Sequence, residues 1–179
     1  MAHEILVGVS GGIAAYKTAA LVSDLVQSDL GVTVVMTRAA TKFVGPATFR
    51  ALTGRPVYTR MFESAQFPLG PHIELARQAE LLCIAPATAH CLAQAAQGMA
   101  DDLLSTLLLS FTGPVVLAPA MNTEMWQKPT VQRNLQQLQE DGLQIVDPQE
   151  GWLSCRQKGI GRMAEPKTIK SSILAALAR

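Results

Sequence analysis

The stretch ILVGVSGGIAAYK, residues 5–17, decides the fold. Its first five residues are apolar and rich in β-branched side chains, which predicts a short buried strand. Gly11 and Gly12 predict a tight turn, and the residues after them have the spacing of a helix. A strand that passes through a glycine turn into a helix is typical of α/β proteins.

Strand and helix patterns alternate along the rest of the sequence. The helical spacing of residues 13–30 ends at Gly31, and Gly45-Pro46 divides residues 39–52 into two short helical pieces. Residues 59–71 look irregular. Further helices are predicted at 73–79, 88–97, 101–110, 130–141 and 167–178, and further strands at 32–36, 56–58, 81–84, 115–118 and 143–146. We therefore expect an α/β, single-domain, Rossmann-like three-layer fold over residues 1–179, with a mostly parallel sheet covered by helices on both faces.

The overall composition suits one domain in a reducing compartment. The chain has 179 residues and a formal net charge of +1, so no nucleic acid and no membrane is expected as a partner. Three cysteines without paired spacing argue against a disulfide framework and a zinc cluster, and favour a cytoplasmic setting. The N-terminus lacks the pattern of a signal peptide, and the apolar run at 103–109 is too short to cross a bilayer.

The turn after the first strand is a candidate phosphate site, because ligands of parallel α/β folds gather beyond the carboxyl ends of the strands. The amides of Gly11 and Gly12, the helix dipole and the hydroxyl of Ser10 favour an anion there. The dinucleotide and Walker spacings are absent, so a plain tight turn is the alternative. Thr37 and Arg38 follow the next strand and can reach the same anion. The combination points to a mononucleotide such as FMN more than to NAD.

Two Ala-Pro-Ala triplets, at 85–87 and 118–120, each follow a predicted strand. Proline lacks a backbone donor and has a fixed φ, so we expect each strand to end there. Small flanking residues let a flat ring approach the main chain closely. The alternative is two simple strand terminators, although a matched pair in one sheet is harder to explain that way.

Asn122 lies just beyond the second triplet. Its side-chain amide can donate to a carboxylate, and Met121, Met125 and Trp126 can form an apolar wall. The alternative assigns Asn122 to capping the following turn, and Met125 and Trp126 to the core. Composition alone favours this alternative.

His72 precedes a predicted helix in the stretch GPHIEL. A histidine has the intrinsic acidity of a general base near neutral pH, although one at a helix start is often a cap or a surface group. Arg77, five residues later, can neutralise an anionic substrate, and a solvated helix arginine is the alternative.

Cys155 lies in a polar stretch with three cations in the same segment, Arg156, Lys158 and Arg162. Cations near a thiol favour its thiolate form, and Gly151, Gly159 and Gly161 permit a loop that opens and closes. A harmless surface thiol is the alternative, and the residues themselves do not decide between the two.

Six stretches, in this order, carry a family resemblance: GGIAAYK, HIEL, IAPATAHC, GMADDLL, PAMNTEMW and GWLSCRQKGIGRMAEP. The chain resembles the homo-oligomeric flavin-containing cysteine decarboxylases over nearly its whole length. The resemblance implies FMN-dependent decarboxylation of 4'-phosphopantothenoylcysteine to 4'-phosphopantetheine in coenzyme A biosynthesis. It implies an FMN-binding domain over residues 1–179 with a C-terminal substrate flap at about 148–165. It also implies a stand-alone decarboxylase, without the ligase domain that follows in many fusion proteins.

The resemblance implies a role for each motif residue. The catalytic residues are His72, Asn122, which also holds the substrate carboxylate, and Cys155, and Arg77 binds substrate. The cofactor-binding residues are Ser10, Gly11, Gly12, Thr37, Arg38, Phe43, Thr88, Ala89, His90, Cys91 and Met121. This chain departs from the family pattern with His90 and Cys91 in place of asparagine and threonine, and with Arg156 in place of glycine.

The resemblance also implies a homotrimer, or a dodecamer built from trimers, with FMN between subunits. Three alternatives have the same fold: a peptidyl-cysteine decarboxylase of the lantibiotic type, a prenylated-flavin synthase, and an FMN-binding regulatory subunit. Cys155 argues against the first, and the PAMNTEMW and HIEL stretches argue against the second. The joint presence of His72, Asn122 and Cys155 argues against the third.

Overall fold

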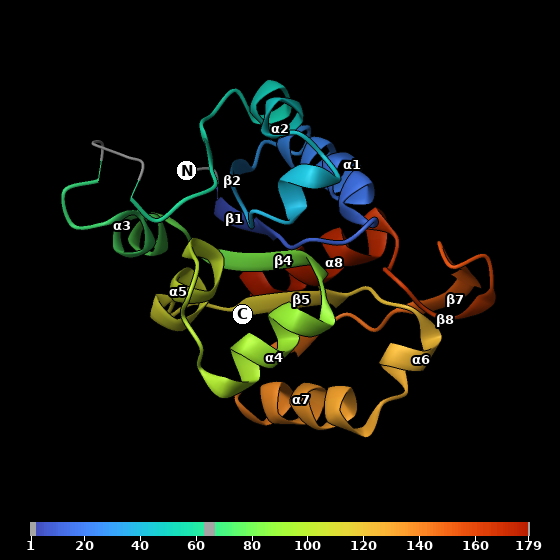
Figure 1. The fold of residues 1–179 in the computed structure, drawn as a ribbon. Helices are drawn as coiled ribbons and strands as arrows, with labels where there is room; N and C mark the ends of the chain where they lie inside the picture. The colour runs from blue at the N-terminus through green and yellow to red at the C-terminus, as the bar shows by residue number, and fades with distance from the viewer. Residues whose placement is uncertain (1–2, 63–66, 179) are drawn as a thin grey trace.

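The computed structural model describes residues 3–62 and 67–178. Its central sheet has the strand order β3-β2-β1-β4-β5-β6, and all neighbouring strands are parallel (Figure 1). The bounds of these strands are β1 Glu4–Val9, β2 Gly31–Met36, β3 Val57–Tyr58, β4 Leu81–Ala87, β5 Val115–Pro119 and β6 Gln144–Ile145. The order reverses between β1 and β4, and in open α/β sheets ligands bind at such a switch point.

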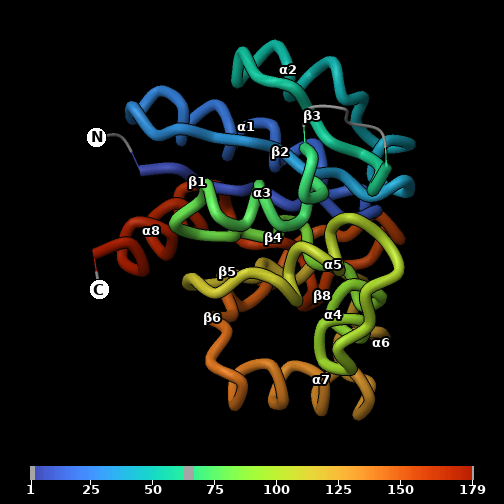
Figure 2. Tube along the Cα trace, turned by 90° about the vertical axis from the view of Figure 1, so that its left-hand side faces the viewer, coloured from blue at the N-terminus to red at the C-terminus, as the bar shows by residue number. Residues whose placement is uncertain are grey.

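Helices cover both faces of the sheet (Figures 1 and 2). One face carries α1 Ala15–Val26, α2 Pro46–Thr53 and α8 Pro166–Leu177, and the other carries α3 Pro71–Gln78, α4 Ala89–Gln97, α5 Leu103–Ser110 and α7 Pro129–Glu140. A short 3-10 helix, Ala40–Lys42, precedes α2. The predicted three-layer Rossmann-like fold is confirmed. Among the described residues, no helix is long and apolar enough to cross a membrane.

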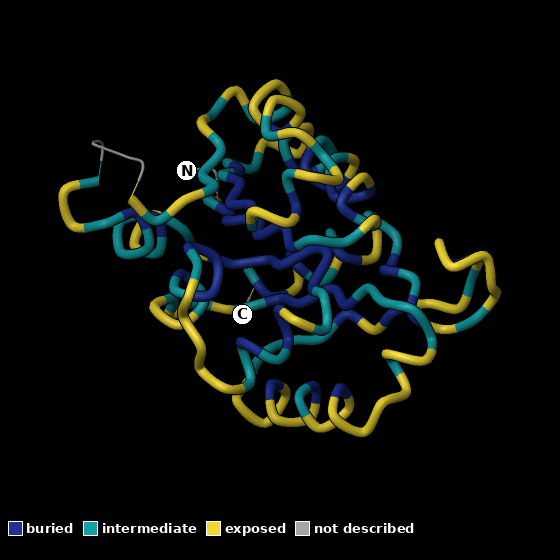
Figure 3. Tube along the Cα trace, viewed as in Figure 1, coloured by how far each residue is buried: buried dark blue, intermediate teal, exposed yellow. Residues whose placement is uncertain are grey.

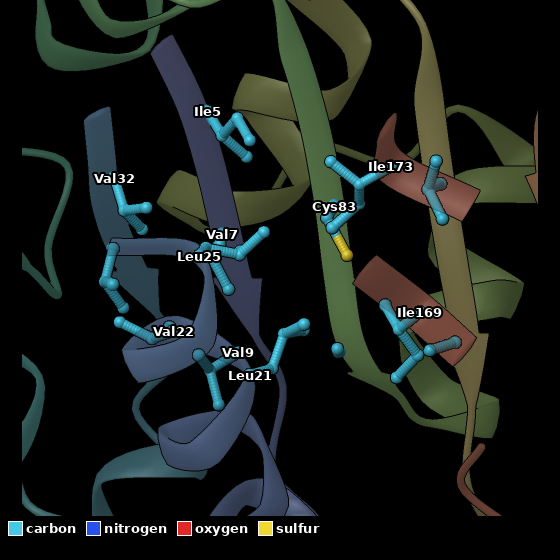
Figure 4. Close-up of a cluster of buried hydrophobic side chains, with 14 of the residues drawn as sticks. Ile5, Val7, Val9, Leu21, Val22, Leu25, Val32, Cys83, Ile169 and Ile173 are labelled. Atoms are coloured by element: carbon cyan, nitrogen blue, oxygen red, sulfur yellow. The ribbon is translucent and has the colours of Figure 1, made fainter. Parts of the chain in front are cut away.

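Each face of the sheet has its own hydrophobic core, because successive strand residues point to opposite faces. Ile5, Val7 and Val9 of β1 pack with α1 and α8 (Figure 4). Leu6, between them in sequence, belongs to the opposite core with α3, α4, α5 and α7. Figure 3 shows the strands buried and the outer helix surfaces exposed. The site at the sheet edge therefore rests on a scaffold that is packed on both sides.

The first helix is shorter than predicted. It ends at Val26, and Asp29, with φ 59°, turns the chain toward β2. Gly31 does not stop the helix but begins β2, where a Cβ would collide with the Glu4 carboxylate of the neighbouring strand. Position 31 requires glycine because the two strands approach so closely there, and the sequence does not reveal this approach.

The two Ala-Pro-Ala triplets end their strands differently. β5 ends at Pro119 as predicted, but the expectation that β4 ends before its triplet is wrong, because β4 runs on to Ala87 with a register shift after Ile84. The peptide bond between Ala85 and Pro86 is cis. The amide of Ala120 donates to the Ala87 carbonyl at 3.2 Å, so the two triplets lie side by side.

Sequence reasoning missed three short elements: α6 Thr123–Trp126, β7 Gln149–Trp152 and β8 Lys158–Arg162. β7 and β8 form an antiparallel hairpin that projects from the right-hand side of Figure 1. At its tip the Leu153 amide donates to the Gln157 carbonyl at 2.8 Å, and the Arg156 amide donates to the Leu153 carbonyl at 2.9 Å. Of the segment predicted as irregular, residues 63–66 lie outside the described residues.

The conformation of Arg156 leads to a stability prediction. Its φ of 62° lies in the left-handed region, which costs a residue with a Cβ about 1–2 kcal/mol and costs glycine nothing. We expect Arg156→Gly to raise the free energy of unfolding by about 0.5–1 kcal/mol, because part of the gain is offset by the entropy of the unfolded chain. Urea denaturation of the variant measures this change.

Gln157→Gly is the matched control, because Gln157 is the next residue of the same tip and has no positive φ. We expect it to lower the stability. Equal effects of the two substitutions would contradict the explanation from backbone conformation.

Candidate active site

A cleft of about 570 Å³ opens at the carboxyl ends of β1, β4 and β5, on the switch point of the sheet. This volume is within the range of small-molecule and cofactor sites. Its walls come from the turn after β1, the start of α4, the loop after β5 and the hairpin. The described residues that line it are Gly11, Gly12, Ile13, Ala14, Tyr16, Lys17, Thr88, Ala89, His90, Ala120, Met121, Asn122, Met125, Trp152, Leu153, Ser154, Gly161, Arg162 and Met163.

The turn after β1 is fastened to the loop after β4 by Ser10. Its hydroxyl is buried and donates to the Pro86 carbonyl at 2.6 Å, and it accepts from the Thr88 amide at 3.0 Å. The hydrogen bonds of Ser10 therefore join the two loops. Its expected contact with a phosphate stays a prediction.

The two glycines of the turn permit close packing of neighbouring segments, and the turn leaves backbone amides free. A Cβ on Gly11 would collide with Ala39, and one on Gly12 would lie 3.4 Å from the Thr88 methyl group. Among the described residues, the amides of Gly11, Ile13 and Ala14 donate to no protein acceptor. Unpaired amides at a helix start form an anion-binding site.

The segment after β2 lies beside this turn but does not line the cleft. Thr37 accepts a hydrogen bond from the Ala40 amide at 3.2 Å, which fixes the start of the 3-10 helix. Arg38 and Phe43 are exposed. The contact between Gly11 and Ala39 is what brings the segment close to the turn. The predicted cofactor contacts of Thr37, Arg38 and Phe43 stay predictions.

Asn122 caps a helix and lines the cleft. Its side-chain oxygen accepts from the Met125 amide at 2.9 Å, which makes it the N-cap of α6. Both interpretations of Asn122 from the sequence are therefore compatible, because the cap uses only the oxygen. Its NH₂ group has no protein acceptor within the part of the chain that the structure describes, and it remains available to a ligand carboxylate.

The base of the hairpin is fastened to the loop that carries Asn122. The Met121 amide donates to the Gly161 carbonyl at 3.0 Å, and the Thr123 hydroxyl donates to the Ile160 carbonyl at 2.8 Å. A Cβ on Gly159 would collide with the Thr123 hydroxyl, and one on Gly161 with the Met121 carbonyl. These two glycines permit close packing, whereas the sequence suggested only loop mobility.

Cys155 lies at the exposed tip of the same hairpin, next to Ser154, which lines the cleft. The structure therefore brings Asn122, Met121 and the cysteine-bearing hairpin to one edge of the sheet. Trp152, with 68% of its surface exposed, lies between the base and the tip and also lines the cleft.

The start of α4 presents only some of its predicted residues to the cleft. Thr88 accepts from the Cys91 amide as the N-cap, and Thr88, Ala89 and His90 line the cleft. Cys91 points into the core instead, where burial first and the charge of Asp102 second raise the pKa of its thiol to about 12. Cys91 is therefore a neutral, buried thiol.

A charged cluster that sequence reasoning missed lies at the cleft wall. The ammonium group of buried Lys17 donates to the Glu165 carboxylate at 3.1 Å and to the Met163 carbonyl at 3.2 Å, and Arg162 also donates to Glu165. The hydrogen bond from Lys17 is the main reason that the pKa of Glu165 lies below its usual value, and Arg162 adds to the effect. Since 148 residues separate the partners, no local pattern indicates the pair.

The lowered pKa of Glu165 predicts a dependence of stability on pH. A carboxyl group with a lowered native pKa adds stability above its unfolded pKa, and this stability is lost as the pH falls through the native value. We expect Glu165→Gln to be less stable than the unchanged protein near neutral pH, because glutamine carries no charge. The two thermal unfolding curves should converge between about pH 5 and pH 3.

Glu124→Gln is the control for this prediction, because Glu124 is an exposed glutamate in the first turn of α6 and has no ion pair among the described residues. It should leave the pH profile of the melting temperature unchanged. A constant difference between Glu165→Gln and the unchanged protein across this pH range would contradict the ion-pair explanation.

His72 and Arg77 lie in α3, which packs on α5 away from the cleft, and neither lines it. The backbone carbonyl of His72 accepts from the Ser110 hydroxyl at 3.4 Å. Its ring Nδ1 is buried and has no hydrogen-bond partner, the one such side-chain atom among the described residues. Within one chain the structure therefore does not bring His72 together with Asn122 and Cys155.

The sheet order and the cleft at its switch point define the class: a doubly wound α/β protein with a ligand site closed on one side by a hairpin. Within this class, the chain belongs to the Flavoprotein family, whose sequence profile matches residues 1–178. The predicted resemblance to flavin-containing proteins is thus confirmed.

Curated relatives share this sequence over part of their own length. The chain is 47% identical over 167 residues to the coenzyme A biosynthesis bifunctional protein CoaBC of Bacillus subtilis, a match that covers 93% of this chain and 41% of that protein. It is 46% identical over 166 residues to CoaBC of Mycobacterium tuberculosis, with 93% and 39% covered. The chain therefore spans about two-fifths of the length of these relatives.

Solved structures match the whole chain. A cysteine-to-serine mutant of PPC decarboxylase, complexed with pantothenoylaminoethenethiol, is 30% identical with a TM-score of 0.89, and 100% of both chains is covered. The FMN-dependent cysteine decarboxylase SpaF is 36% identical with a TM-score of 0.86, covering 98% of this chain and 95% of that one.

Proposed function

We propose that this protein is an FMN-dependent decarboxylase that converts 4'-phosphopantothenoylcysteine to 4'-phosphopantetheine in coenzyme A biosynthesis. The observation that carries the proposal is the joint placement of Asn122 and a cysteine-bearing hairpin at one cleft. The curated relatives named for coenzyme A biosynthesis and the solved PPC decarboxylase complex support it. The proposed flap spans residues of about 148–165 and contains the hairpin.

The residues of the cleft fit FMN. The amides of Gly11, Ile13 and Ala14 have no acceptor among the described residues and are available to a phosphate, whereas the Gly12 amide donates to the Ser10 carbonyl at 3.0 Å. The adjacent alanines leave space for a flat ring. The solved structure of SpaF, an FMN-dependent cysteine decarboxylase, supports FMN as the cofactor of this fold. Gly11, Gly12, Thr88, Ala89, His90 and Met121 would hold it.

The reaction needs an electron sink, because loss of CO₂ from a cysteine amide would otherwise leave an unstabilised carbanion. FMN held in the cleft would supply this sink, as a reversible two-electron acceptor for the CH₂–SH group. Once oxidised in this way, the substrate carries a C=S bond, so that loss of CO₂ leaves an enethiolate. Asn122 orients the departing carboxylate, and Cys155 donates the proton at the neighbouring carbon when the electrons return.

His72 completes the site from a neighbouring subunit in this proposal. The buried Nδ1 of His72 has no hydrogen-bond partner among the described residues, and leaving a buried hydrogen bond unmade costs about 1–3 kcal/mol, which supports a partner from a neighbouring subunit. In a homotrimer, or a dodecamer of trimers, α3 of one subunit would face the cleft of the next, where His72 removes a proton during substrate oxidation and Arg77 binds the substrate. The three cysteines are free, which supports a reducing, cytoplasmic location.

The test is to mix the purified protein with FMN, remove unbound flavin, and supply 4'-phosphopantothenoylcysteine. We expect flavin absorbance to travel with the protein and CO₂ to be released from this substrate. A peptide that ends in cysteine is the comparison substrate. Release of CO₂ from the peptide alone would replace this proposal with a peptidyl-cysteine decarboxylase, and failure to bind FMN would remove both.

A further inference from the structure

The cleft wall beside the hairpin carries an uncompensated positive charge. Lys17 and Arg162 both line the cleft, and no carboxylate is among the described residues that line it. Glu165 lies behind them and accepts hydrogen bonds from both. Its pKa is below the usual value, so it carries one negative charge at neutral pH. Two cations against one carboxylate leave one positive charge for a ligand.

Arg162 is the cation that can offer this charge. The Lys17 side chain is 9% exposed, and its ammonium group already has two acceptors. The Arg162 side chain is 40% exposed, and a guanidinium group has five N–H donors, of which Glu165 takes one in this structure. The remaining donors can take a carboxylate or phosphate in the paired geometry that guanidinium groups favour.

Arg162 is also held in place before a ligand arrives. A Cβ on Gly151 would lie 2.8 Å from its Cδ and 3.1 Å from its Nη1, so the side chain runs directly across the β7 backbone. Glu165 holds the far end of the side chain. Gly151 therefore does more than permit flap mobility, because its lack of a side chain makes space for the Arg162 side chain to cross β7.

We propose that Arg162, held by Glu165 and packed across Gly151, is a substrate-binding residue that takes an anionic group of the substrate. This inference rests on the proposed function, whose substrate has two such groups, a carboxylate at the reacting end and a phosphate at the other. Either group matches the charge and the donors of the guanidinium. Arg162 makes the cleft selective for acidic over neutral thiols.

The experiment compares FMN-loaded protein and its Arg162→Met variant with four compounds. 4'-Phosphopantothenoylcysteine has both anions, pantothenoylcysteine has only the carboxylate, 4'-phosphopantetheine has only the phosphate, and pantetheine has neither. The first two are assayed as substrates by kcat/KM, and the last two as competitive inhibitors by Ki. A charge-assisted hydrogen bond is worth a factor of about ten to one hundred in these constants.

The pattern of losses identifies the anion. If Arg162 binds the phosphate, Arg162→Met loses about tenfold to a hundredfold on both phosphorylated compounds and nothing on the other two. If it binds the carboxylate, both substrates lose equally and both inhibitors are unaffected. Arg162→Lys keeps the charge without the planar fork, and should recover part of the loss in either case.

Lys158→Met is the matched control, because Lys158 is a cation of the same strand whose side chain is 74% exposed and pairs with Glu150 at 3.6 Å. It should change none of the four constants. An equal loss on all four compounds, no loss on any, or a loss of FMN binding alone would overturn the assignment of Arg162. If the unchanged protein acts on neither substrate, the proposed function fails first, and this inference fails with it.

Discussion

Replacing Cys155 with serine is expected to separate the release of CO₂ from the formation of the saturated thiol. In the proposed mechanism the flap cysteine acts only after decarboxylation, so CO₂ release should continue in this variant while the proton donor for the final reduction is missing. A serine hydroxyl is a far weaker acid than a thiol, and loss of a positioned acid typically costs about a hundredfold to ten-thousandfold. We expect formation of 4'-phosphopantetheine to fall by at least about a hundredfold, with an enethiol accumulating in its place.

The two products are measured in the same anaerobic sample, CO₂ by its isotope label and the sulfur compound by mass spectrometry. Gln157→Ala is the matched control, because Gln157 is an exposed residue of the same tip that does not line the cleft. It should form both products normally. Normal formation of the saturated thiol by Cys155→Ser would remove Cys155 from the mechanism.

A second large effect is expected when two inactive variants are mixed. His72→Asn and Asn122→Ala should each lose about a hundredfold to ten-thousandfold in decarboxylation, because each lacks one group of the site. If the groups come from different subunits, a randomly mixed oligomer of equal parts contains sites with both intact. Such a site needs one subunit of each kind in the right order, so activity should return to about one quarter of the unchanged protein.

The mixing experiment requires that subunits are dissociated and reassembled together, or are produced together. A mixture of His72→Asn with Cys155→Ser is a second pair, measured by formation of the saturated thiol, which neither variant should form alone. Cys155 is proposed to act in the same cleft as Asn122. Each variant alone, taken through the same reassembly, is the control. Mixed oligomers that remain as inactive as either parent would show that His72 does not complete a neighbouring subunit's cleft.

The sequence was sufficient to predict the class of fold, because alternating strand and helix patterns are local properties. The sequence did not predict the order of the strands, because strand pairing joins segments such as β1 and β4 that are more than 70 residues apart. The hairpin was predicted only as a flap, because Gly159 and Gly161 interrupt the alternation that marks a strand. Their purpose, contact with Thr123 and the Met121 carbonyl, exists only in three dimensions.

The sequence predicted the motifs of the site better than their arrangement in space. Asn122 and the glycine turn lie where the pattern of strand ends placed them. Cys91 and His90 are neighbours in sequence, yet one faces the core and the other faces the cleft, because the rotation of α4 about its axis is set by packing. No sequence pattern indicated that Lys17 pairs with Glu165, since an ion pair between distant residues leaves no local pattern.

The most direct measurement is a single anaerobic turnover of 4'-phosphopantothenoylcysteine by the FMN-loaded protein, with CO₂ and the sulfur product quantified together. If the flavin takes two electrons from the substrate and returns them while Cys155 donates a proton, the turnover should yield equal amounts of CO₂ and saturated 4'-phosphopantetheine, with the flavin returned to its oxidised colour. Release of CO₂ with a product lacking two hydrogens, or with the flavin left reduced, would contradict the roles of Cys155 and the flap.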